Sequence, residues 1–127
     1  MLVEREGRVS VWVGRFAGEP ALRSYVEVSY DGDEGSCPFW ADAGAGWFDE
    51  DFLEAEFHPG GLVAGRLVAR HSYGRSFAGP AEAALAGMPA ATANAVIVAY
   101  DVEHVPERAA PEGPVWFVGS FDYQRTG

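Results

Sequence analysis

Seven consecutive uncharged residues, 94–100 (NAVIVAY), form a dense apolar run with three β-branched side chains in a row. Such side chains favour strands, and a run without polar alternation is typical of a strand that is buried on both faces. We therefore predict a central strand here. Val96 and Val98 are expected to be among the least exposed residues, with Ile97 buried on the opposite face of the sheet.

Weaker patterns along the chain predict a sheet covered by helices. The predicted strands are 9–13, 94–100 and 115–123, and the predicted helices are 19–30, 62–70 and 77–87. They rest on apolar alternation for the strands and on helical spacing for the helices. This order predicts a single α+β domain over residues 1–127, a sandwich in which a small, mainly antiparallel sheet of about three or more strands is covered by helices.

Two segments leave alternatives open. Residues 49–57 (DEDFLEAEF) begin with acids that favour a first helical turn, but Leu53, Ala55 and Phe57 also alternate as in a strand; we prefer the helix. For residues 102–114 we predict either a turn or a long hairpin connection between the last two strands.

Four aromatic residues raise the question of core or interface. Trp40, Trp47 and Phe48 lie in the turn-rich segment 31–48, where aromatic side chains either fold back onto the core or anchor a partner. Trp12 points away from Val11 and Val13, so a sheet covered on one face only would leave it partly exposed. It is therefore a secondary interface candidate.

Charge is unevenly distributed. The chain has a formal net charge of −10, and residues 31–56 contain nine acidic residues and no basic one. Nucleic acid is excluded as a partner by this balance, because binding a polyanion requires a basic face. The acidic segment either attracts a basic protein or simply keeps the chain soluble.

Several chemical classes are excluded by missing residues. The chain contains no Lys, so a Walker-type phosphate loop and a pyridoxal Schiff base are impossible. His58, His71 and His104 match no zinc spacing, and we expect no metal and no cofactor. Cys37 lacks any nucleophile signature and is expected to be a plain thiol. Because it is the only cysteine, an internal disulfide is ruled out. No apolar run is long enough to span a membrane and no signal peptide is evident, so we expect a cytoplasmic protein.

One run of polar residues is compatible with the alternative that the chain is a small enzyme. His71, Ser72, Tyr73 and Arg75 lie within six residues and could form an anion-binding pocket, although a loop held by local hydrogen bonds fits equally. The acids at 49–51 lack the spacing of a calcium-binding loop. We find no set of residues in the sequence that forms a recognisable catalytic group.

An ordered set of segments resembles the bacterial immunity protein 22 family. These are the strand VSVWVGRF, the helix around Tyr25, a D-G-D turn, and the segments WFDEDFLEAEF, SYGRSF and NAVIVAYDVE, which together run from Val9 to Glu103. The resemblance implies a non-enzymatic protein that binds and neutralises a cognate polymorphic toxin. Many such toxins are nucleases with basic active faces, which an acidic inhibitor would complement.

The sequence therefore predicts an immunity protein with an acidic toxin-binding surface. The candidate partner-binding residues are Asp33, Glu34, Asp49, Glu50, Asp51, Glu54, Trp40, Trp47 and Trp12. A small enzyme built on 71–75 and a general adaptor domain are the alternatives. The sequence does not specify the oligomeric state.

Overall fold

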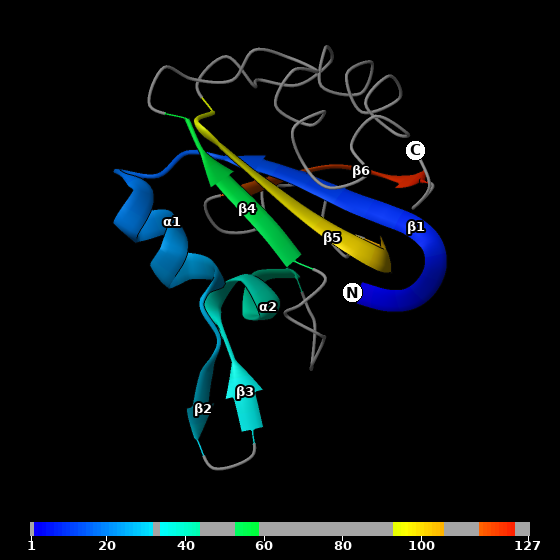
Figure 1. Ribbon diagram of the computed structural model, residues 1–127, viewed down its shortest axis with the longest axis horizontal. Helices are drawn as coiled ribbons and strands as arrows, with labels where there is room; N and C mark the ends of the chain where they lie inside the picture. The colour runs from blue at the N-terminus through cyan, green and yellow to red at the C-terminus, as the bar shows by residue number, and fades with distance from the viewer. Residues whose placement is uncertain (1, 32–33, 44–52, 59–92, 106–114, 124–127) are drawn as a thin grey trace.

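A four-stranded antiparallel sheet is the centre of the fold (Figure 1). The computed structural model describes residues 2–31, 34–43, 53–58, 93–105 and 115–123. The elements are β1 (Leu2–Gly14), α1 (Glu19–Val26), β2 (Ser29–Asp31), β3 (Glu34–Ser36), α2 (Pro38–Ala43), β4 (Leu53–Phe57), β5 (Ala95–His104) and β6 (Val115–Asp122). The sheet order is β4-β5-β1-β6, and β2 and β3 form a separate two-stranded hairpin. The predicted α+β class, with a mainly antiparallel sheet and helices, is confirmed.

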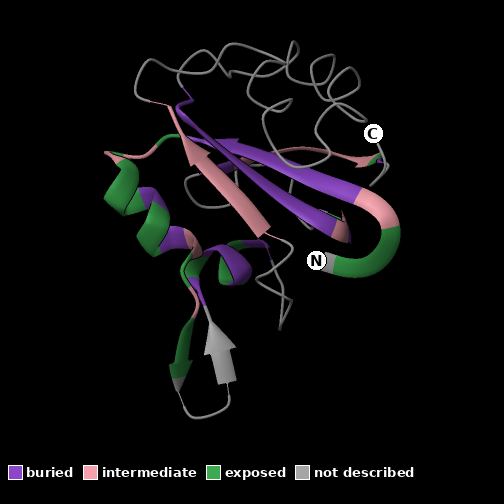
Figure 2. Ribbon diagram, in the orientation of Figure 1, coloured by how far each residue is buried: buried purple, intermediate pink, exposed green. Residues whose placement is uncertain are grey.

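The strand predicted over 94–100 lies inside the sheet as β5, between β4 and β1. Its register with β1 places Val98 opposite Val11 and Ile97 opposite Trp12. Val96, Ile97 and Val98 are all at most 1% exposed, with Ile97 on the other face from the two valines. The prediction of a central strand buried on both faces is confirmed, and Figure 2 shows the burial along β5 and the adjoining half of β1.

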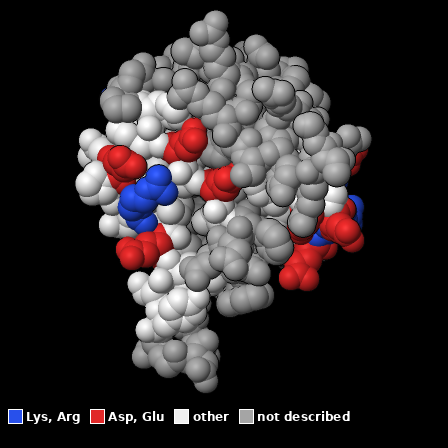
Figure 3. Space-filling view, in the orientation of Figure 1, with Lys and Arg blue, Asp and Glu red and all other residues white. Residues whose placement is uncertain are grey.

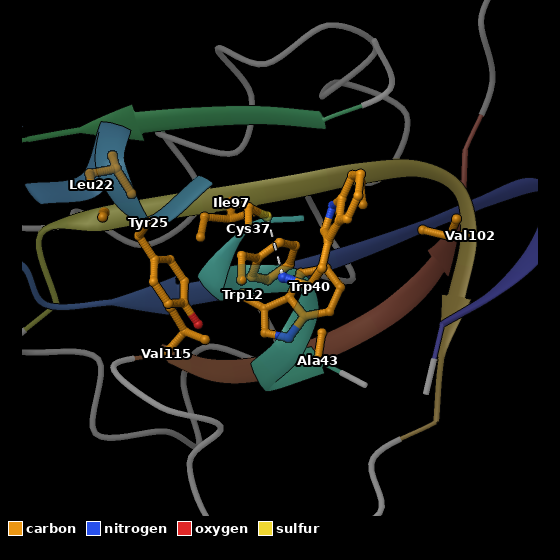
Figure 4. Packing of buried hydrophobic residues seen from close by; sticks show 12 residues of the cluster. Trp12, Leu22, Tyr25, Cys37, Trp40, Ala43, Ile97, Val102 and Val115 are labelled. Atoms are coloured by element: carbon orange, nitrogen blue, oxygen red, sulfur yellow. Dashed lines mark hydrogen bonds between the residues drawn. The ribbon is translucent and has the colours of Figure 1, made fainter. Parts of the chain in front are cut away.

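The described helices pack on the face of the sheet that contains Ile97. Leu22 and Tyr25 of α1 and Phe39 and Trp40 of α2 belong to the same buried cluster as Trp12 (Figure 4). The Trp12 and Phe39 rings meet edge to face at a centroid distance of 4.9 Å. The prediction that Trp12 is partly exposed is therefore wrong: its side chain is 0% exposed. The face opposite Val11 and Val13 is the one that the helices cover, and sequence alternation alone does not reveal which face is covered.

A bulge bends β1 where it meets the end of β5. The register with β5 shifts between Glu4 and Val9, and Gly7 in this bulge has φ +83°. Asp101 of β5 also has a positive φ, 59°. Its Oδ1 accepts hydrogen bonds from the Gly7 N–H at 3.1 Å and from the Tyr123 hydroxyl at 2.6 Å. One carboxylate thus joins β1, β5 and the end of β6 at the bend.

The helix predicted over 19–30 is shorter than expected. It begins at Glu19, next to Pro20 as predicted, but ends at Val26, where Glu27 takes up extended backbone with φ −71° and ψ 128°. Residues 29–31 are the strand β2 instead. The alternation of Val26, Val28 and Tyr30 before the Gly-Asp pair at positions 32 and 33 of the sequence is the hairpin signal that the helical spacing concealed.

The segment 49–57 is not a helix over its last five residues, because 53–57 form β4. Pairing with β5 satisfies the β4 backbone, and Leu53, Ala55 and Phe57 pack against the helix-covered cluster. The acids at 49–51 and the predicted helices 62–70 and 77–87 lie outside the described residues. The alternative of a long hairpin connection between the last two strands is also wrong, since β1 lies between β5 and β6 in the sheet.

Helix α2 lies inside a segment that the sequence indicated to be turns. Pro38 occupies its first turn, and the Cys37 sulfur accepts a hydrogen bond from the Trp40 N–H at 3.4 Å, as an N-cap side chain does. The Tyr25 hydroxyl donates to Asp42 Oδ2 at 2.7 Å and so ties α1 to α2. The Cys37 side chain is buried, which is one of the placements expected for a plain thiol.

Candidate partner-binding surface

The predicted partner-binding residues fall into three groups. Trp12 and Trp40 are core side chains, 0% and 2% exposed. Glu34 starts β3 opposite Asp31 in the hairpin, and Glu54 lies on β4 with an intermediate exposure. The remaining predicted residues lie outside the described part of the chain: Asp33, Trp47, Asp49, Glu50 and Asp51.

The burial of Trp40 has a local cause. Helix α2 directs Trp40 and Ala43 into the cluster that also holds Trp12, as Figure 4 shows, and Phe39 belongs to the same cluster. An indole that is only 2% exposed offers almost no surface to a partner. The alternative that aromatic side chains of this segment fold back onto the core is the correct one for Trp40, and neither Trp12 nor Trp40 is retained as an interface candidate.

An open hollow lies between α1, β2 and β4. Its volume is about 370 Å³. Four partly buried apolar residues contribute to its lining: Val26, Val28, Leu53 and Ala55. Glu27 and Tyr30 also line it and are exposed, Tyr30 to 59%. We call this feature the α1–β4 hollow.

Arg23 fixes one wall of the α1–β4 hollow. Its guanidinium donates to the Ala55 carbonyl of β4 at 3.1 Å and meets the Glu19 carboxylate at 3.5 Å. The first contact crosses from helix to strand, and the second is an i,i+4 pair along the helix. Both partners are exposed, so the ion pair adds little stability, but the two contacts together hold the cation beside the strand.

Acidic groups surround that single arginine on α1 and β4. Glu19 and Glu27 are exposed at the helix, and Glu54 and Glu56 are half-exposed on the strand. Glu56 Oε2 lies 3.1 Å from Nε2 of the His58 ring. Figure 3 shows acidic side chains on this face around one basic side chain. The described α1 and β4 surface therefore carries more carboxylates than cations.

A second charged group, at the bend of β1, is balanced instead. Arg8 contacts Asp122 at 2.9 Å and Glu103 at 3.1 Å, and Arg5 contacts Glu103 at 2.8 Å. The hydrogen bond to Asp122 raises the pKa of the Arg8 guanidinium above its ordinary value, against the opposing effect of burial. Two cations here face two carboxylates in a closed network, so this group stabilises the strands and leaves little net field.

No catalytic arrangement is found among the described residues. The Ser10 hydroxyl contacts that of Ser120 at 2.7 Å and donates to the Val102 carbonyl, while the His104 N–H donates to both hydroxyls. Ser10 and His104 are buried, and these contacts join β1, β5 and β6 within the sheet. In the same part of the chain, no group of three His, Cys, Asp or Glu side chains is placed to hold a metal ion. The polar run 71–75 lies outside it.

Sequence reasoning missed the α1–β4 hollow and its exposed Tyr30. The helix predicted over 19–30 would have placed Tyr30 on a packed helical face, whereas the real hairpin turns it outward. The period-two alternation from Val26 to Tyr30 was the available signal.

Comparison with protein-family models identifies a family. A family model described as Immunity protein 22 matches residues 9–124. Neither curated proteins nor solved structures give a significant match. Within the described elements, no helix is long and apolar enough to cross a membrane.

Proposed function

The chain belongs to the Immunity protein 22 family, and from this premise we propose that it is a non-enzymatic inhibitor that binds and neutralises a cognate toxin domain in the cell that makes both. The family implies toxin neutralisation. The mode of inhibition, by occupying a basic face of the toxin, and the action in the cytoplasm are parts of the proposal. No cofactor or metal enters it.

The observation that carries the proposal is the extent of the family match. It runs from Val9 in β1 to residue 124, past the end of β6, and so includes the second half of β1, the other three strands of the sheet and both described helices. A match confined to one motif would indicate only a shared local structure. A match over most of the chain supports a shared role.

Charge supports an acidic binding surface within this role. The acids proposed to face the toxin are Asp33, Glu34, Asp49, Glu50, Asp51 and Glu54, all from the segment that carries no base. A one-signed field of this kind accelerates encounter with a basic protein, and individual rim charges act mainly on the association rate. Trp47 and Phe48 are the remaining aromatic candidates for an apolar anchor in this segment.

Co-expression with the toxin encoded beside this chain tests the proposal. We expect cells to survive toxin expression when the chain is present, and we expect the purified pair to form a stable complex. Protection should saturate at about one chain per toxin, because an inhibitor acts by occupancy whereas an antidote enzyme turns over. A chain that neither binds the toxin nor protects the cell contradicts the proposal, and protection at strongly substoichiometric amounts favours the enzyme alternative.

A further inference from the structure

Tyr30 is the most exposed large apolar side chain of the described residues. It is 59% exposed, compared with 52% for Val105 and 37% for Val3. Unlike those two valines, it stands at an open hollow whose apolar lining comes from both α1 and β4. Tyrosine beside a partly apolar recess is the composition typical of binding hot spots, because the ring supplies large contact area at a small entropic cost.

The charge around the hollow selects the kind of occupant. Arg23 is already engaged by Glu19 and by the Ala55 carbonyl. Glu27, at the rim, has no ion-pair partner among the described residues. A second copy of this chain is disfavoured as occupant, since its net charge of −10 repels the same surface. A cationic side chain with an apolar stem complements both the carboxylate and the lining.

We propose that the α1–β4 hollow receives an arginine side chain from the surface of the toxin. Its aliphatic stem lies over Val26, Val28 and Leu53, and its guanidinium stacks on the Tyr30 ring and pairs with the Glu27 carboxylate. Arginine suits this site better than lysine because its planar cation both stacks on an aromatic ring and binds a carboxylate in a bidentate manner. This inference rests on the proposed function and adds a contact point that lies partly outside the acidic segment 31–56.

Two variants of the hollow and two matched controls test this inference. The probe is the toxin domain encoded beside this chain, inactivated by a substitution in its own active site. Tyr30→Ala removes the ring and Glu27→Lys reverses the rim charge. Val105→Ala removes a similarly exposed apolar side chain, and Glu6→Lys makes the same charge change at an exposed position of β1. Thermal melting of all four variants checks that each remains folded.

We expect each hollow variant to raise the Kd of the complex about tenfold or more, and each control to change it less than about threefold. Tyr30→Phe, which keeps the ring, should bind nearly as well as the wild type. In the complex, hydroxyl-radical labelling of Tyr30 should fall to less than about half of its value in the free chain.

Two results would overturn the inference. If the wild-type chain binds and protects but both hollow variants bind equally well, the hollow is not a contact point, and the proposed function survives. If the wild-type chain does not bind the toxin at all, the proposed function fails and this inference fails with it.

Discussion

At the scale of single residues, Asp101 combines an unfavourable backbone with well-placed partners. It is the only non-glycine residue with positive φ among the described residues. Aspartate tolerates this region better than most residues because its short polar side chain can bond locally. Here the side chain instead bonds Gly7 and Tyr123, which lie 94 and 22 residues away in sequence. The strain is therefore offset by contacts between three strands.

Replacing Asp101 by alanine tests this account. Asp101→Ala loses both hydrogen bonds and keeps the strained backbone, so we expect a loss of about 1–3 kcal/mol in the free energy of unfolding. Asp101→Asn retains an oxygen acceptor and tolerates positive φ, so it should lose clearly less. Urea unfolding followed by circular dichroism measures both values. Equal stability of wild type and Asp101→Ala would contradict the role given to this carboxylate.

Trp12 supports the fold rather than the interface, and its truncation should show this. Trp12→Ala removes a fully buried indole that packs on Phe39 and Phe117. Large-to-small changes of this kind cost about 3–5 kcal/mol, a large part of the stability of a small domain. We expect a strongly lowered Tm, whereas Val3→Ala at an exposed site should change it little. An unchanged Tm for Trp12→Ala, together with weakened toxin binding, would restore Trp12 to the interface.

At the scale of elements, the sequence correctly predicted the helices and strands whose residue pattern is compatible with only one type of secondary structure. Val96, Ile97 and Val98 indicated a central strand because three β-branched side chains in a row suit few other structures. Leu53 to Phe57 fit helix and strand equally, and pairing with β5, a contact 42 residues distant at Ala55 and Ile97, decided the outcome. Helix α2 was missed because its cap is a cysteine, which is not among the usual capping residues.

The link between the two described helices gives a prediction at this scale. Tyr25→Phe removes the hydrogen bond to Asp42 and leaves the ring that packs on Phe16 and Phe39. We expect a loss of about 0.5–1.5 kcal/mol in the free energy of unfolding. Ser24→Ala, at an exposed position of the same helix, should remain within about 0.5 kcal/mol of the wild type. Denaturant unfolding of both variants distinguishes a real tie between helices from a bond without effect on stability.

At the scale of the whole molecule, composition gives the distribution of charge along the chain but not the places where side chains meet. The excess of acids in 31–56 is a property of the sequence and needs no fold to be recognised. The α1–β4 hollow is different, because its lining residues are far apart in sequence. Val26 and Tyr30 come near Leu53 only because α1 packs beside β4 in the fold. Trp40 shows the converse, since its place in an acidic, turn-rich segment suggested an interface and the fold buried it.

The acidic segment as a whole should govern how fast the toxin is captured. Changing Asp49, Glu50 and Asp51 together to arginine removes three negative charges from 31–56 and adds three positive ones, so long-range attraction to a basic toxin weakens. We expect the association rate to fall by about tenfold or more at low salt, and its dependence on ionic strength to flatten, because salt then has less attraction to screen. Stopped-flow mixing with the inactivated toxin across a range of salt concentrations measures both. Reversing Glu4, Glu6 and Glu112 makes the same change in net charge outside the segment, and it should slow association less. If the two triple variants associate at the same rate and with the same salt dependence, the acids of 49–51 contribute only to net charge and do not form a toxin-facing surface.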